Sequence, residues 1–472
     1  MSKTIEERRS GRDNLIFATK LVLLIYTMLI AVPWMQHWLY FGKKLTCAWT
    51  LVLSGYLIFA DTAHFKTKEY LMMGLFCVSY AVTIVLNIQS YFVNEVLILG
   101  YTVSLFFMLT YCDGRRSHEA VKKELWTLMY AIIAISFVFS AINLWIYFDT
   151  YPGMVRGTAG SYFYGIIGGQ LGGIYNPNTG GTINYISILL ALLVMHGADK
   201  KGKILLWVNI VLQFWCFSLV QSRGAWVSLI AFIVLYFAFV WDRASLNLPK
   251  KIIAKVLLIA LCIPLAMGLS KGMRHATVGI INRPSDDIII DSEDETAPDK
   301  LLPGKHDDIT AGDRDMGNEG VSDFTTGRAE IWSIGMKKLC QQPLMGVGYR
   351  SIDDVLAEEL SEYDYDNSGA GGLHNVYLTI LLSSGIVGGI FFAAVLVLLL
   401  LKVLKIYRSK SAPAYVKYLA TLIPVWLAGD LVESRIALSF NQMSVLFWII
   451  AGYVLYFAKE CENYDQSDRS GL

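Results

Sequence analysis

The stretch that decides the fold class lies at residues 376–401 and reads VYLTILLSSGIVGGIFFAAVLVLLLL. It contains no Asp, Glu, Lys or Arg, and a helix of about 20 such residues matches the hydrocarbon thickness of a bilayer. The rest of the chain has the same character, since 55% of its 472 residues are hydrophobic and 17% are charged. Soluble domains carry about 25% charged residues, so the composition predicts a polytopic membrane protein.

Comparable apolar runs recur along the chain and predict an all-α membrane fold with about 12 transmembrane helices. The first run, residues 15–32, lacks a small-residue cleavage site and is followed by further runs, so we expect a retained helix and not a signal peptide. The runs begin near Asn14, Leu45, Tyr70, Phe92, Leu125, Thr182, Ile204, Ala225, Ile252, Val376, Val416 and Gln442.

Basic residues alternate along the connections in the pattern that sets membrane orientation. The N-terminal segment is basic, and so is every second connection after it, at residues 66–68, 115–123, 200–203, 243–251 and 402–410. The intervening short connections hold few basic residues, namely Lys43, Lys44, Arg156, Arg223 and Arg435. This pattern predicts that both termini are cytoplasmic. The net charge of +1 gives no indication of a nucleic-acid partner.

The orientation divides the chain into three parts. We expect transmembrane helices 1–9 in residues 1–270, an extracytoplasmic loop in 271–375, and the last three helices with a cytoplasmic tail in 376–472. Within the loop, residues 282–323 are crowded with Asp, Glu, Pro and Gly, which is typical of a solvated linker. Residues 325–375 should be ordered and helical in part.

A helical pattern supports that last expectation. Apolar and small residues recur at helical spacing until Pro343 ends the run: Ile331, Trp332, Gly335, Met336, Leu339 and Cys340. The pattern predicts an amphipathic helix that lies on the membrane domain.

Arg328 stands at the first turn of this helix, where unpaired backbone N–H groups and the helix dipole favour an anion. A guanidinium added at that position makes a phosphate-binding site. The alternative is a surface arginine paired with Glu330 or with the acidic linker.

Arg223 lies in a turn between two apolar runs, next to Ser222, and so at or slightly below the outer interface. A charge deep in a membrane span costs roughly 2.5–3.5 kcal/mol, which indicates a function or a pairing. The alternative is an interfacial arginine that extends to the lipid headgroups.

His374 and Asn375 come directly before the apolar run that begins at Val376. A histidine at the boundary between water and membrane can act as a base near neutral pH, and Asn375 can cap the following helix. The alternative for His374 is an ordinary residue at a helix start.

Three glycine and acidic motifs have simpler interpretations. Gly346-Val347-Gly348 predicts a turn, and Gly385 with Gly389 predicts a helix-packing face. Asp313 and Asp315 resemble an acidic metal-binding pair, but no nucleotide-binding domain surrounds them, so we expect neither a metal nor another cofactor.

The order of these motifs resembles the O-antigen ligase and O-antigen polymerase (Wzy-like) superfamily of bacterial membrane glycosyltransferases. The resemblance covers residues 173–390. Its elements are Gly173-Ile174-Tyr175-Asn176-Pro177-Asn178, Ser222-Arg223-Gly224-Ala225, Gly327-Arg328 with Trp332, residues 343–348, and His374-Asn375 leading to Gly385-Ile386-Val387-Gly388. The acidic insert at 282–323 departs from the compact loop of the family.

The resemblance implies an integral-membrane glycosyltransferase (GT-C-like) fold in the bacterial cytoplasmic (inner) membrane. It implies inverting, metal-independent transfer of a glycan from undecaprenyl pyrophosphate to an acceptor hydroxyl on a glycan or lipid-linked acceptor, at the outer face of that membrane and among its lipids. Arg223 and Arg328 would hold the pyrophosphate, and His374 would deprotonate or orient the hydroxyl. The supporting residues would be Asn375, Trp332, Asn176 and Ser222.

Several alternatives remain open from the sequence. A repeat-unit polymerase and an O-antigen ligase share these motifs, with a slight preference for the polymerase, and a protein O-oligosaccharyltransferase differs only in its acceptor. A lipid-linked glycan transporter or flippase would usually show internal repeats, which are not evident here. A non-catalytic scaffold would leave the clustered Arg and His residues unexplained.

Overall fold

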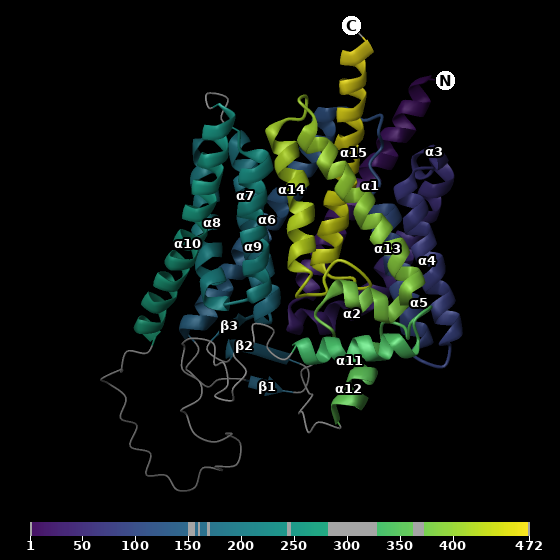
Figure 1. Cartoon of the computed structure of the whole chain (residues 1–472), viewed down its shortest axis with the longest axis horizontal. Helices are drawn as coiled ribbons and strands as arrows, with labels where there is room; N and C mark the ends of the chain where they lie inside the picture. Colours follow the sequence, from purple (N-terminus) through teal and green to yellow (C-terminus); the bar gives the residue numbers. More distant parts are fainter. Residues whose placement is uncertain are drawn as a thin grey trace. The chain divides into compact units, whose positions relative to one another are not determined.

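The computed structural model describes residues 2–149, 156–158, 161–167, 170–242, 247–281, 328–361 and 372–470 (Figure 1). The acidic insert at 282–323, with Asp313 and Asp315, lies outside the described residues, as do residues 325–327 and 362–371 of the segment predicted to be ordered. The helices are α1 (Ser2–Ile30), α2 (Pro33–Ala60), α3 (Thr62–Phe65), α4 (Lys68–Leu86), α5 (Phe92–Val103), η1 (Ser104–Leu109), α6 (His118–Asp149), α7 (Pro177–Val194), η2 (Met195–Gly197), α8 (Lys200–Val220), α9 (Arg223–Leu235), η3 (Tyr236–Val240), α10 (Leu248–Ile281), α11 (Arg328–Gln341), α12 (Ser351–Ser361), α13 (Val376–Arg408), α14 (Ala414–Gly429) and α15 (Gln442–Ser470).

The predicted class, an all-α polytopic membrane protein, is confirmed. Among the described residues, ten helices are long and apolar enough to cross a membrane. Each of the predicted apolar runs lies in a helix, but α14 has only 16 residues and α2 carries Lys43 and Lys44. These two helices account for the difference between ten and the predicted number.

The chain forms two compact units, which we describe separately. Unit 1 consists of Met1–Ile132, Gly224–Ala260 and Val321–Leu472, and unit 2 of Ile133–Arg223 and Leu261–Gly320. The predicted division into residues 1–270, 271–375 and 376–472 follows the order of the chain. The two units are defined by spatial contact and do not test it, so this division stays a prediction.

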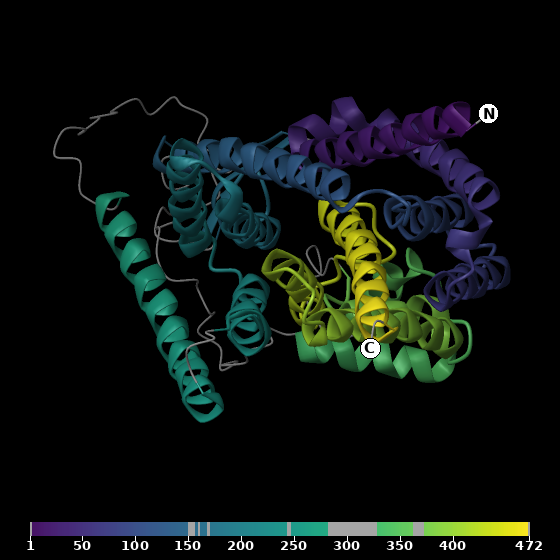
Figure 2. The same cartoon turned by 90° about the horizontal axis from the view of Figure 1, so that it is seen from above.

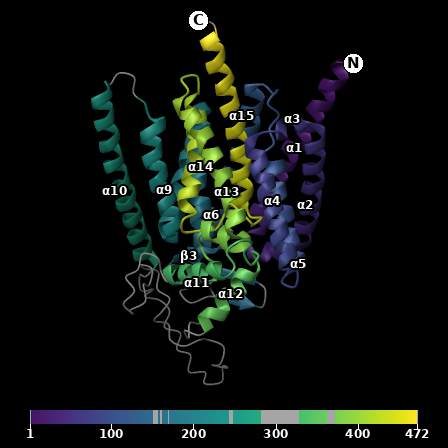
Figure 3. The same cartoon turned by 45° about the vertical axis from the view of Figure 1, so that its right-hand side comes forward.

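In unit 1, α15 lies in the middle of the helices (Figure 2) and contacts α1, α13, α14 and η1. Its residues between 442 and 458 are almost all buried. Both chain termini lie at one end of this unit, and α11 and α12 lie at the opposite end (Figure 3).

Helix α11 confirms the helix predicted before Pro343. Its apolar face packs against α12 and α13 in a buried cluster that includes Ile334, Leu339, Leu356 and Leu382. This packing fixes the position of the first residue of α11, Arg328.

Helix α13 is broken at Gly385, where φ is 66° and ψ is −174°. A Cβ there would lie 2.2 Å from the carbonyl oxygen of Leu344. The connection after α11 occupies this break, since Pro343 O accepts a hydrogen bond from Ile386 N at 2.8 Å and Val347 N donates to Leu382 O at 2.9 Å. Gly385 is therefore a break in the helix and not the helix-packing position that its spacing to Gly389 predicted.

Unit 2 contains three strands that the sequence did not predict: β1 (Arg156–Thr158), β2 (Ser161–Ile167) and β3 (Gln170–Gly173). They form an antiparallel sheet in the order β1-β2-β3, and β3 packs on α7 and α8. Gly173 has φ of 63°, and Asn143 Oδ1 accepts a hydrogen bond from Ile174 N at 2.7 Å. These strands are short and rich in glycine, which weakens the usual strand pattern.

Candidate active site

Arg328 begins α11 and points its guanidinium at the connection between α14 and α15. Its Nη1 donates to the carbonyl oxygen of Val432, and its Nη2 lies 3.3 Å from Oε1 of Glu433. The arginine therefore has partners in the loop between α14 and α15, whereas the side chain of Glu330 and the acidic linker lie outside the described residues. A guanidinium has five N–H donors, more than these two contacts use.

Glu433 joins Arg328 to His374. Its second carboxylate oxygen, Oε2, lies 3.7 Å from Nδ1 of His374, and the residue is 8% exposed. Burial alone would raise the pKa of Glu433, but the neighbouring His374 and the guanidiniums of Arg435 and Arg328 lower that pKa below its ordinary value. The carboxylate is thus held ionised between an arginine and a histidine.

His374 has a left-handed backbone conformation, with φ of 46°. Few residues other than Gly adopt this conformation, with Asn, Asp and His the most frequent among them, and such conformations are concentrated at functional sites. The strain persists because both flanks are held: Trp332 Nε1 donates to Leu373 O at 2.8 Å, and Asn375 caps α13 by accepting from Tyr377 N and Leu378 N. Trp332 and Asn375 therefore hold the histidine in place.

The loop that carries Glu433, residues 430–441, is itself held in place. Asn375 Nδ2 donates to Leu431 O at 2.9 Å, and Val376 N donates to the carbonyl oxygens of Asp430 and Glu433. Asp430, which is fully buried, accepts from Arg435 Nε at 2.7 Å. The start of α13 and this loop consequently form one hydrogen-bonded assembly.

The remaining predicted site residues, Asn176, Ser222 and Arg223, belong to unit 2, whereas His374 belongs to unit 1. Asn176 caps α7 by accepting from Thr179 N at 2.9 Å, and Ser222 Oγ donates to Asn178 Oδ1 at 3.3 Å. Arg223 is the last residue of this segment of unit 2. The next residue, Gly224, belongs to unit 1, where a Cβ on it would lie 3.0 Å from Cγ of Glu433.

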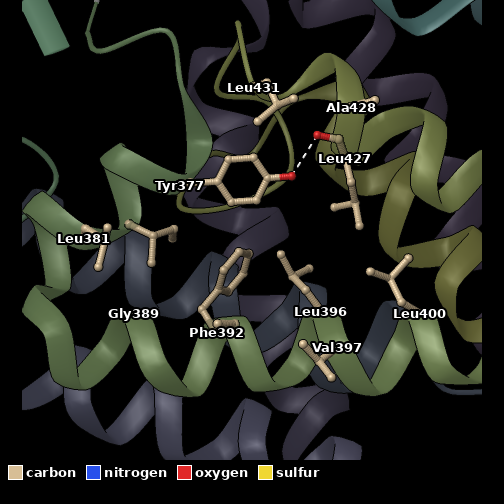
Figure 4. Close-up of a pocket in the computed structure, with 12 residues that line it drawn as sticks. Tyr377, Leu381, Gly389, Phe392, Leu396, Val397, Leu400, Leu427, Ala428 and Leu431 are labelled. Atoms are coloured by element: carbon tan, nitrogen blue, oxygen red, sulfur yellow. Dashed lines mark hydrogen bonds between the residues drawn. The ribbon is translucent and has the colours of Figure 1, made fainter. Parts of the chain in front are cut away.

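An apolar groove of about 500 Å³ begins one turn beyond His374, between α13 and α14 (Figure 4). Its lining includes Phe392, Leu396 and Leu431, and Tyr377 is its one residue with a polar side chain. The Tyr377 hydroxyl is already used, because it donates to Leu427 O at 2.7 Å. Beyond the break at Gly385, the groove follows α13 from Gly389 to Leu400, a helical rise of about 16 Å, which is about half the hydrocarbon thickness of a bilayer.

The fold and site define a class of protein, an integral membrane protein with a charged cluster at the end of its helices. Residues 208–393 match the family model described as O-antigen ligase, which supports the predicted resemblance to the O-antigen ligase and Wzy-like superfamily. A comparison with curated proteins gave no match. The family indicates a membrane enzyme that transfers glycans in O-antigen or polysaccharide biosynthesis, with lipid-linked glycan and acceptor substrates.

The matched segment includes Arg223, Arg328 and His374 but ends before Glu433. Sequence reasoning missed Glu433 altogether. One signal could have indicated it: Asp430, Glu433 and Arg435 stand close together in a short connection between two apolar runs.

Proposed function

We propose that the chain is an inverting glycosyltransferase at the outer face of the bacterial cytoplasmic membrane. It transfers a glycan from undecaprenyl pyrophosphate to an acceptor hydroxyl, without a metal. The observation that supports this most strongly is the cluster of Arg328, Glu433 and His374 next to the apolar groove. A charged group beside an apolar channel fits a substrate with a pyrophosphate head and a prenyl tail.

His374 is the proposed base. A proton on Nδ1, held toward the carboxylate of Glu433, leaves the lone pair on Nε2 for the acceptor. A buried carboxylate that orients a histidine also stabilises the imidazolium that forms. A general base of this kind contributes roughly 10²- to 10⁴-fold in rate.

The reaction is a single displacement. The acceptor oxygen bonds to the anomeric carbon from the side opposite the pyrophosphate, and the carbon–oxygen bond to the pyrophosphate breaks. The electron pair leaves with undecaprenyl pyrophosphate, and the proton of the hydroxyl passes to His374.

Two arginines would stabilise the negative charge of the leaving group. Arg328 contributes its guanidinium together with the N–H groups of the first turn of α11. Arg223 is assigned the same role because it lies in the segment that matches the family. Its direct link to Gly224, which packs near Glu433, supports that role. Ser222 and Asn176 would support the turn that carries Arg223.

The groove along α13 would hold part of the prenyl tail. Val397 and Leu431 are each more than half exposed, so a chain lying in the lipid could enter from the side. The alternating basic connections predict that both termini lie in the cytoplasm and α11 outside. This prediction requires the termini and α11 to lie at opposite ends of unit 1, as they do (Figure 3).

The test is reconstitution of the purified chain in liposomes with lipid-linked repeat units. We expect release of undecaprenyl pyrophosphate together with longer glycans. A ladder of repeat units indicates a polymerase, and a single addition to a lipid A core or to a protein indicates a ligase or an O-oligosaccharyltransferase. If no pyrophosphate lipid is released but the donor crosses the bilayer, the protein is a transporter and the proposal is wrong.

A further inference from the structure

A second cavity of unit 1 is unlike the groove. It has a volume of about 270 Å³ and lies among α2, α5, the start of α12 and the loop before α15. Three cationic side chains line it, from Lys43, Lys44 and Arg350. We propose that this cavity binds an acidic sugar residue of the glycan, through the sugar's carboxylate.

The charges of the cavity favour an anion. Within the described ranges, no carboxylate forms an ion pair with any of the three cations. The buried carboxylate of Glu95 on α5 accepts hydrogen bonds from the Tyr80 hydroxyl and, at 2.7 Å, from Arg350 N. Asp353 on α12 interacts electrostatically with Arg350, so the positive charge available to a ligand comes mainly from the two lysines on α2.

Aromatic rings supply a surface for the body of a sugar. Tyr101 stacks on Phe440 with ring centroids 4.5 Å apart and an interplanar angle of 17°. The Tyr101 hydroxyl donates to Lys43 O at 2.9 Å, which ties this pair to the cationic wall. Tyr40, Asn94 and Ser439 add polar groups to the lining, and such a mixed lining is typical of pockets that orient small polar ligands.

The size and the strain of the cavity point to a ligand site. Its volume is near the lower end of the range for small-molecule pockets, about 300–1,000 Å³, and therefore suits one sugar residue. Leu438 in its wall has φ of 55°, a strained conformation for leucine. An inorganic phosphate would use the cations but not the stacked rings, which is why we assign an acidic sugar.

One loop carries residues of both the cavity and the candidate active site. Along residues 430–441, Leu431 lines the groove, Glu433 contacts Arg328 and His374, and residues 438–440 line the cavity. The inference rests on the proposed function, since a glycan reaches this loop only if the chain handles lipid-linked glycans.

Direct binding tests the inference without turnover. The full chain in nanodiscs is titrated with trigalacturonate, with the neutral maltotriose and with inorganic phosphate. We expect trigalacturonate to bind at least about tenfold more tightly than maltotriose, the effect of one charge-assisted hydrogen bond. The double variant Lys43→Gln/Lys44→Gln and the single variant Arg350→Gln should each weaken binding by about the same factor.

The matched control is Lys66→Gln/Lys68→Gln, which removes the same charge from two exposed residues and should bind as wild type does. Thermal unfolding of each variant separates lost binding from lost folding, and Arg350→Gln remains if the double variant does not fold. The inference is overturned if maltotriose binds equally well, if phosphate displaces trigalacturonate at equal concentration, or if no variant weakens binding. If the chain turns over lipid-linked repeat units but does not bind trigalacturonate, the inference is wrong and the proposed function stands. If it binds trigalacturonate but shows no turnover, only the proposed function is overturned.

Discussion

The groove along α13 and the cavity beside α2 and α5 belong to the same unit but have opposite linings. The groove is apolar except for Tyr377, whereas the cavity combines Lys43, Lys44 and Arg350 with aromatic rings. Between them along the loop 430–441 stands Glu433, in contact with Arg328 and His374. One loop thus separates the proposed binding sites for the lipid half and the sugar half of an amphiphilic substrate. The proposed catalytic residues lie at the boundary between these two sites.

Loss of Arg328 should strongly disrupt the chemistry proposed at this boundary. Arg328→Gln removes charge-assisted hydrogen bonds worth about 1.5–3 kcal/mol each, so release of undecaprenyl pyrophosphate should slow by about 10- to 150-fold. Lys338→Gln removes a charge from the last turn of the same helix and should keep the wild-type rate. Equal rates for the two variants would contradict a role for Arg328 in the reaction.

Filling the groove should affect the lipid half alone. Ala428→Phe places a ring where the prenyl tail would lie, and loss of contact with about two methylene groups, at about 0.8 kcal/mol each, raises KM for the donor by roughly tenfold. The value of kcat should not change. Ala134→Phe adds the same ring to an exposed position on α6, and a similar rise in KM for that control would mean that the groove is not the tail site.

Salt should weaken ligand binding to the cavity but not to the groove, and this effect should be smaller than the two above. The Debye length falls from about 10 Å at 0.1 M to about 3 Å at 1 M ionic strength, so binding of trigalacturonate to the cavity should weaken several-fold. Binding of a neutral polyprenol to the groove should not weaken. Titrations at both salt concentrations measure this, and a parallel loss of both affinities would remove the contrast.

The smallest expected effect concerns acid stability. The pKa of Glu433 in the folded protein lies below its ordinary value of 4.5, so its ionised form stabilises the fold above that value. This contribution disappears as the pH falls through the folded-state pKa. Glu433→Gln should therefore reduce the loss of thermal stability below pH 4.5, whereas Glu119→Gln, at an exposed position on α6, should follow wild type.

The sequence predicted the parts of the fold that depend on local pattern. The apolar runs, the helix before Pro343 and the cap at Asn375 follow from hydropathy, helical periodicity and residue type, and they are confirmed. The roles of Arg223, Arg328 and His374 stay predictions, although Arg328 and His374 do contact the same carboxylate.

What the sequence did not predict depends on segments distant along the chain. Glu433 is separated from His374 by α13 and α14, so no local pattern indicates that they meet. The same holds at Gly385, because small-residue spacing fits both a packing face and a break. Only the arrival of Pro343 and Leu344 at that point determines the break.

The most direct test of the central claim, that Glu433 and His374 act together as the base, is a double-mutant cycle in the liposome assay. We expect His374→Ala to lower the rate of pyrophosphate-lipid release by roughly 10²- to 10⁴-fold. Glu433→Gln should lower the rate in wild type but have much less effect when His374 is already absent. His196→Ala, at an exposed histidine, serves as the control. A wild-type rate for His374→Ala, or independent effects that multiply in the double variant, would contradict the claim.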